Sequence, residues 1–95
     1  MDIEFHDRHL RELYVTGKCR KLKFDKNVIK HFMEVMAIIV AAKDILDLWK
    51  FPGLNFEKLT NTERYSLRLN RQWRLEISIT DESVVIIECI SNHYG

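Results

Sequence analysis

The sequence predicts a single α+β domain, residues 1–95, in which an N-terminal strand and two helices pack on one face of a mainly antiparallel three- to five-stranded sheet. Apolar residues between Ile29 and Val40 recur at the spacing of a half-buried helix. After Pro52 the apolar period changes to two, as in strands. A strand, two helices and then strands joined by short turns is the order of an α+β fold.

The N-terminal half contains the first strand and the helices. Apolar and polar residues alternate over residues 2–6, which predicts a half-buried strand. Asp7 is a typical N-cap residue and Gly17 a typical helix end, so they delimit a first, short helix. Asp25 is expected to cap the second helix. The unbroken apolar run 35–42 predicts that this part of the helix is deeply buried or covered by a partner.

The C-terminal half is expected to form most of the sheet. Residues 44–49 extend the second helix or add a turn, which Pro52 and Gly53 end. The segments with the pattern of strands are 56–59, 65–69, 73–79 and 84–90. The tight connection after 65–69 predicts a hairpin with 73–79, and the β-branched segment 84–90 predicts an interior strand buried on both faces.

Composition excludes several classes of protein. The chain has 15 Lys and Arg against 14 Asp and Glu, so overall charge does not indicate a nucleic-acid binder. The apolar run 35–42 is too short to span a bilayer, and no signal-peptide pattern is present, so we expect a cytoplasmic protein without membrane contact. Cys19 and Cys89 are interpreted as free thiols in a reducing compartment, with Cys89 a small buried hydrophobe. His6 and His9 lack an evident third ligand, so no metal site is predicted.

A basic stretch lies between the two predicted helices. Residues 18–30 contain six lysines and arginines, among them Lys21 and Lys23, against the single acid Asp25. Such a run is usually a solvated connector, and the stretch alone favours that interpretation. The alternative is a surface that faces phosphates.

Strand alternation places arginines together on the sheet face away from the helices. Arg68 and Arg74 share that face, Arg64 precedes the hairpin and Arg71 lies at its tip. An exposed sheet face is polar in any case, and Glu76 could pair with an arginine. The choice of arginine at all four positions nevertheless favours a phosphate site, because the guanidinium offers a planar fork of donors.

Two titratable residues follow the last strand. His93 is a candidate general acid or base beside the arginines, and Tyr94 comes next. A lone terminal histidine is more often inert, but one that follows a strand beside two arginines is a better candidate.

The hairpin sequence LTNTERYSLRLNRQWRLEISI resembles the signature YS-x-R-x-N-x-Q-[YW]-R-[IL] of HigB-type toxins in the RelE superfamily. The ending VVIIECISNHYG is similar to their last strand and its His and Tyr tail, and ELYVTGKCRKLKF with the long helix after it also looks like this group. Many relatives have Leu-Lys-Gly where this chain has Leu59-Thr60-Asn61, so one expected lysine is missing, and Lys58 is the nearest substitute.

The resemblance implies a RelE-like fold and a ribosome-dependent mRNA endonuclease that uses no metal or other cofactor. The RNA 2′-OH would attack the adjacent phosphate. Arg68 and Arg74 match the two hairpin arginines and would stabilise the transition state. His93 matches the family histidine as general acid or base. Tyr94, a weaker match, would stack on a base or assist proton transfer.

Further phosphate contacts are expected from Lys58, Arg64, Arg71, Lys21 and Lys23. The resemblance also implies partners: the ribosome and its mRNA, and a cognate antitoxin of helix-turn-helix type, through which alone the protein would meet DNA. Two alternatives remain open. One is a non-catalytic ParE-like toxin acting on DNA gyrase, and the other is a binding module active only in an autorepressing toxin-antitoxin complex.

Overall fold

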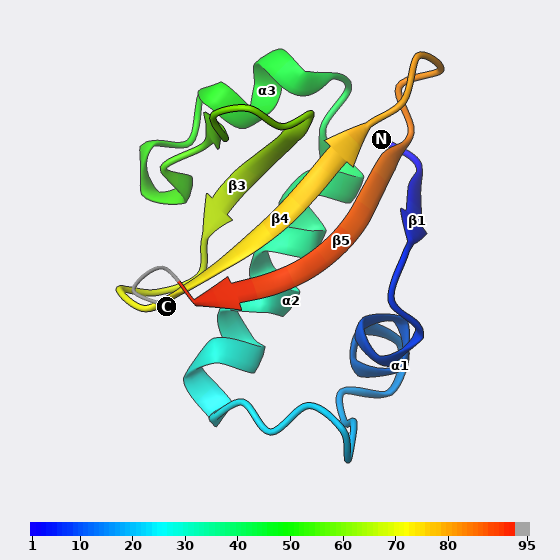
Figure 1. The fold of residues 1–95 in the computed structure, drawn as a ribbon, viewed down its shortest axis with the longest axis vertical. Coiled ribbons are helices and arrows are strands. Elements are labelled where there is room, and N and C mark those ends of the chain that lie inside the picture. The colour runs from blue at the N-terminus through cyan, green and yellow to red at the C-terminus, as the bar shows by residue number, and fades with distance from the viewer. Residues whose placement is uncertain (93–95) are drawn as a thin grey trace.

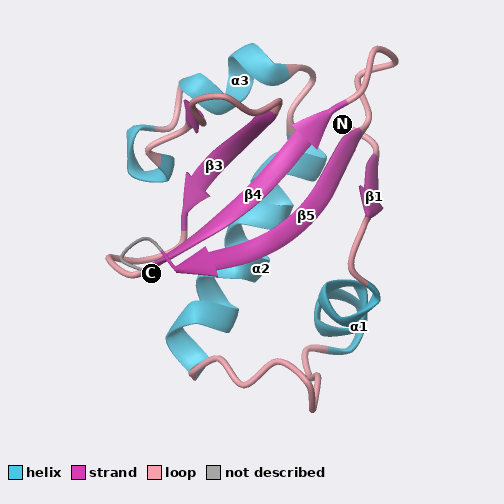
Figure 2. Cartoon of the chain, viewed as in Figure 1, coloured by secondary structure: helices cyan, strands magenta, loops and turns pink. Residues whose placement is uncertain are grey.

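The computed structural model describes residues 1–92 and confirms the α+β prediction (Figures 1 and 2). Its elements are β1 (Ile3–Phe5), α1 (Arg8–Thr16), α2 (Lys26–Ala41), α3 (Ile45–Trp49), the 3₁₀ turn η1 (Pro52–Leu54), β2 (Glu57–Lys58), β3 (Arg64–Arg68), β4 (Trp73–Ile79) and β5 (Val85–Asn92). The strands form one sheet in the order β1-β5-β4-β3-β2. β1 runs parallel to β5 and the other pairs are antiparallel, as expected for a mainly antiparallel sheet.

The ends of α1 are formed by the residues that the sequence predicts. The Asp7 carboxylate accepts a hydrogen bond from the backbone N–H of His9 at 2.7 Å. Gly17 adopts a left-handed conformation with φ 77°, and its N–H donates to the Leu13 carbonyl at 2.8 Å. Asp25 occupies the N-cap position of α2, but its side chain makes no capping hydrogen bond within residues 1–92.

The helical segment after α2 is a separate element. Ala42 has extended backbone angles, which end α2. Asp44 then accepts hydrogen bonds from the N–H groups of Leu46 at 2.9 Å and Asp47 at 3.4 Å, and this caps α3. The second half of α2 was expected to be deeply buried or covered by a partner, and burial within the chain holds for one stripe only, because Ala37, Val40 and Ala41 are exposed.

The core lies between α2 and one face of the sheet. Figure 1 shows α2 behind β4 and β5, while no helix covers the face turned toward the viewer. The fully buried side chains include Phe32, Met36 and Ile39 of α2, Leu10 and Leu13 of α1, and Leu67, Leu75, Ile77, Val85 and Ile87 of the sheet. We call the uncovered side of β2, β3, β4 and β5 the open face.

A β-bulge in β5 changes which residues face the core. Ile77 pairs with Ile87 and Glu76 pairs with Cys89, so Glu88 is the extra residue. The extra residue shifts the alternation, and Cys89 therefore lies on the open face beside Glu76. This corrects two predictions. Cys89 is a half-buried residue of the open face and not a core hydrophobe, and β5 is buried on one face only.

Candidate functional site

The hairpin register brings the two predicted arginines directly opposite each other. Arg68 at the end of β3 pairs with Arg74 near the start of β4. Ser66 pairs with Glu76 and Arg64 with Ser78, so these side chains also belong to the open face. The placement agrees with the strand alternation, and the catalytic role of the arginines remains a proposal.

Arg74 is held in place by neighbours on the open face that include Glu57 and Ser66. Its guanidinium donates to the Glu57 carboxylate at 2.5 Å and to the Ser66 hydroxyl at 3.3 Å. The Arg74 side chain is 14% exposed and Ser66 is 1% exposed, so the charge is fixed in a largely desolvated setting. A fixed guanidinium can meet an anionic transition state with little reorganisation.

Glu57 is a site residue that the sequence analysis missed. It lies opposite Ser66 in the short strand β2, which puts its half-exposed carboxylate on the open face. The predicted strand 56–59 indicated that either Glu57 or Lys58 would lie on the open face. Choosing between Glu57 and Lys58 required the register against β3, which the sequence does not contain.

Arg64 belongs to a separate network of charges on the same face. Its guanidinium lies 3.0 Å from the Glu76 carboxylate and 3.7 Å from that of Glu88. The hydrogen bond that Arg64 donates to Glu76, followed by the charge of Glu88, raises the pKa of Arg64 above its ordinary value. The Arg64 guanidinium also lies 3.7 Å from Cys89 Sγ, and burial raises the pKa of that thiol.

Glu88 gathers a second group of polar side chains. Its carboxylate accepts a hydrogen bond from the Ser78 hydroxyl at 2.7 Å. The His6 Nδ1 lies 2.8 Å from the other carboxylate oxygen. His6 therefore does not pair with His9, as a zinc pair would require. His9 lies instead near Glu12 and Cys19.

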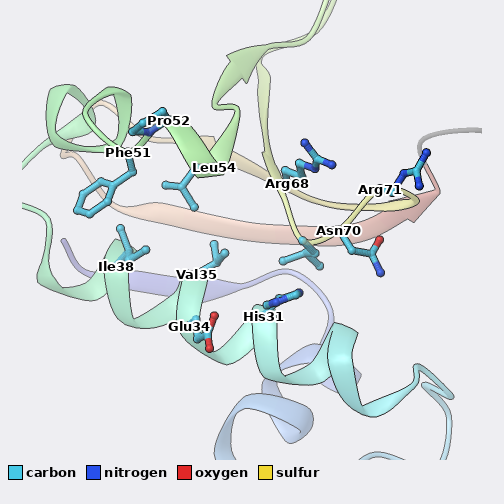
Figure 3. Close-up of a pocket in the computed structure, with 12 residues that line it drawn as sticks. His31, Glu34, Val35, Ile38, Phe51, Pro52, Leu54, Arg68, Asn70 and Arg71 are labelled. Carbon is cyan, nitrogen blue, oxygen red and sulfur yellow. The ribbon is translucent and has the colours of Figure 1, made fainter.

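Arg68 and Arg71 also border a groove of about 500 Å³ between the hairpin and α2. Figure 3 shows Arg68, Asn70 and Arg71 along one rim, and His31 and Glu34 of α2 along the other. The apolar residues that line it include Val35, Ile38, Phe51, Leu54 and Leu69. Arg68 thus connects the open face with a largely apolar groove.

The remaining predicted residues lie apart from this centre or outside the described chain. Lys58 pairs with Tyr65, whose ring stacks on Phe56, so Lys58 lies on the opposite side of the sheet from Arg74. Its amino group is 4.0 Å from Glu63. The predicted site residues His93 and Tyr94 lie outside residues 1–92.

The basic stretch approaches the hairpin through one aromatic contact. Lys21 and Lys23 are exposed between α1 and α2. The next residue, Phe24, packs edge-on against Trp73 at the start of β4, with ring centroids 5.0 Å apart. Within residues 1–92, no helix is long and apolar enough to cross a membrane.

Comparisons with known proteins identify the family. Solved structures with the same fold include a YoeB-YefM complex from Staphylococcus aureus (TM-score 0.62, 21% identity, 99% of this chain and 98% of that one covered). YafQ from Escherichia coli BL21(DE3) has a TM-score of 0.56 and 15% identity, with 98% and 93% covered. No curated protein sequence matches the chain. A family described as the RelE-like toxin HigB of type II toxin-antitoxin systems matches residues 3–93. The chain therefore belongs to the HigB-like family of RelE-like type II toxins.

Proposed function

We propose that the chain is a ribosome-dependent, metal-independent endoribonuclease that cleaves mRNA in the cytoplasm and is neutralised by a cognate antitoxin. The observation that carries the proposal is the pairing of Arg68 with Arg74 on the open face. Two guanidinium groups on adjacent strands can hold a phosphodiester from two sides and neutralise the charge that develops on it.

The proposed reaction is an internal phosphoryl transfer. The ribose 2′-oxygen loses its proton to a general base and attacks the adjacent phosphorus. The bond to the 5′-oxygen breaks, and a general acid protonates that oxygen. The products are a 2′,3′-cyclic phosphate and a free 5′-OH. Arg74 stabilises the added negative charge from its fixed position, and the exposed Arg68 closes on the phosphate from the hairpin side.

Proton transfer needs two groups near Arg74. Glu57 is the carboxylate bonded to the Arg74 guanidinium, and it is half exposed, so an RNA hydroxyl can reach it. His93 stays the proposed partner in the opposite role, with Tyr94 stacking on a base or assisting. Arg71, Lys21 and Lys23 would contact RNA phosphates around the site, whereas Arg64 is engaged by Glu76 and Glu88.

The antitoxin is proposed to occupy the groove beside Arg68. Exposed apolar residues continue from the groove across α2 and α3: Val40, Leu46, Trp49 and Phe51. A segment with apolar side chains and a carboxylate would cover this surface and meet Arg68 and Arg71 at the rim. The solved relatives include toxin-antitoxin complexes, YoeB with YefM and YafQ with DinJ. The helix-turn-helix type of the antitoxin, and contact with DNA only through it, remain part of this proposal.

The test is mRNA cleavage by purified protein with translating ribosomes. We expect cleavage only when ribosomes are engaged on the message. Arg74→Ala and Arg68→Ala should remove cleavage and growth arrest while the chain stays folded. Arg8→Ala, an exposed arginine of α1, is the matched control and should stay active. Intact mRNA together with DNA damage after induction would reject the nuclease and favour a gyrase toxin.

A further inference from the structure

Three potential metal ligands lie close together at α1, and none of them has a role in the proposed RNA cleavage. His9 and Glu12 are three residues apart on α1, so their side chains share one helix face. Cys19 follows the turn after the helix. A ring nitrogen of His9, a carboxylate oxygen of Glu12 and the Cys19 sulfur all lie within 4.8 Å of one another.

The backbone turn after α1 places Cys19 beside the helix. Gly17 has φ 77°, which reverses the chain at the end of α1. The Thr16 hydroxyl lies 2.8 Å from the carbonyl oxygens of both Glu12 and Lys18, and the Lys18 N–H donates to it at 3.2 Å. The position of Cys19 against the helix is therefore set by hydrogen bonds on both sides of the turn.

We propose that His9, Glu12 and Cys19 form a binding site for a zinc ion. Imidazole nitrogen, carboxylate oxygen and thiolate sulfur are the ligands that zinc takes in proteins, and the thiolate disfavours magnesium and calcium. Ligand atoms in a tetrahedral zinc site are about 3.5 Å apart, so modest side-chain rotations complete the site. Water occupies the fourth position, and the proton of the Cys19 thiol passes to the solvent on binding.

A bound zinc ion would connect the basic stretch to α1, because Cys19 belongs to that stretch and His9 and Glu12 belong to the helix. Cys19 begins the segment that carries Lys21 and Lys23 and ends at Phe24, whose ring packs on Trp73 of the hairpin. Zinc binding therefore links α1 to the start of β4 through one short segment. This site stands apart from the proposed RNA cleavage, because the binding measurement does not involve RNA.

The experiment is titration of the full chain with Co²⁺ and then Zn²⁺. We expect one equivalent of metal, a thiolate-to-cobalt charge-transfer band, and displacement of cobalt by zinc. At zinc 100-fold above its Kd, the unfolding midpoint should rise by about 10–20 °C. Trypsin cleavage after Arg20 and Lys21 should slow when zinc is bound. Magnesium should have no effect on any of these readouts.

Matched variants separate this site from incidental metal binding. Cys19→Ser should weaken zinc binding about 100-fold or more, because loss of an outer-shell partner alone costs about 10- to 100-fold. Glu12→Gln, at an exposed position that tolerates the change in folding, should weaken it at least about tenfold. Cys89→Ser and His6→Gln should bind zinc as the unchanged chain does. The proposal is overturned by absence of zinc binding, or by Glu12→Gln and Cys19→Ser binding within threefold of the unchanged chain.

Discussion

Replacing Arg74 by lysine tests whether a fixed guanidinium, and not merely a positive charge, serves the proposed reaction. Arg74 donates to both Glu57 and Ser66 in the structure. A lysine ammonium is a compact charge on one nitrogen without the planar fork, so it cannot replace Nη1 beside Glu57 and Ser66 and at the same time offer phosphate a second nitrogen. The variant therefore preserves the net charge but removes the planar arrangement of donors.

The expected magnitudes separate activity from folding. Loss of one preorganised donor to a transition state costs about 10²–10³ in rate, or about 2.7–4 kcal/mol. Ser66 is 1% exposed, and leaving its hydroxyl without a donor costs at most about 1–3 kcal/mol. Typical domains have about 5–15 kcal/mol of stability, so the variant stays folded at 25 °C. Its unfolding midpoint should fall by about 4–8 °C for each kcal/mol lost.

The assay measures single-turnover cleavage of ribosome-bound mRNA alongside thermal unfolding. Ser66→Ala is the matched control, because it removes the same hydrogen bond and leaves the Arg74 guanidinium with Glu57. We expect this control to cleave within about tenfold of the unchanged chain. If Arg74→Lys cleaves within threefold of the unchanged chain while the fall in midpoint is observed, Arg74 is a structural residue and the reasoning is refuted.

Three further predictions concern neighbouring features. Glu57→Gln should lower cleavage about 10²–10⁴-fold if its carboxylate moves a proton, whereas Glu63→Gln, 95% exposed in its side chain, should not; equal rates would remove Glu57 from the mechanism. Asp44→Ala should destabilise the fold by about 1 kcal/mol through loss of the α3 cap, measured by urea unfolding, and an unchanged midpoint would contradict the cap. Burial raises the pKa of Cys89, so the folded chain holds this proton more tightly than the unfolded chain. The resulting stability is present at neutral pH and lost as pH rises through the folded-state pKa. In Cys19→Ser protein, iodoacetamide should accordingly label Cys89 more slowly at pH 8 than it labels an unfolded peptide, and equal rates would contradict the shift.

The hairpin was predictable because its pattern is local. Alternation fixes which residues of β3 and β4 share a face, and a tight connection leaves little freedom in the register. The same local reasoning found Asp7 and Gly17 at the ends of α1. Features of this kind depend on neighbours within a few residues along the chain.

The features that could not be predicted depend on pairings between distant segments. The bulge at Glu88 is visible only against β4, and it moves Cys89 from the core face to the open face. For a similar reason Glu57, and not the predicted Lys58, faces Arg74, since only the register with β3 decides which of the two lies on the open face. His9 lies near Cys19 because the chain turns at Gly17. From the sequence, only His6 was considered as a partner of His9, and therefore no metal site was predicted.

The charge balance of the open face gives a physical reason for the proposed ribosome dependence. Three arginines, Arg64, Arg68 and Arg74, share this face with the carboxylates of Glu57, Glu76 and Glu88. A free RNA phosphate must compete with those carboxylates for the guanidinium groups of Arg64 and Arg74, so binding from solution gains little. A ribosome that holds the message against the hairpin removes the entropic cost of that encounter and supplies a high effective concentration of the scissile phosphate. Near-neutral charge is therefore compatible with the proposed cleavage, because it suppresses attack on free RNA and leaves the arginines available where the substrate is already positioned.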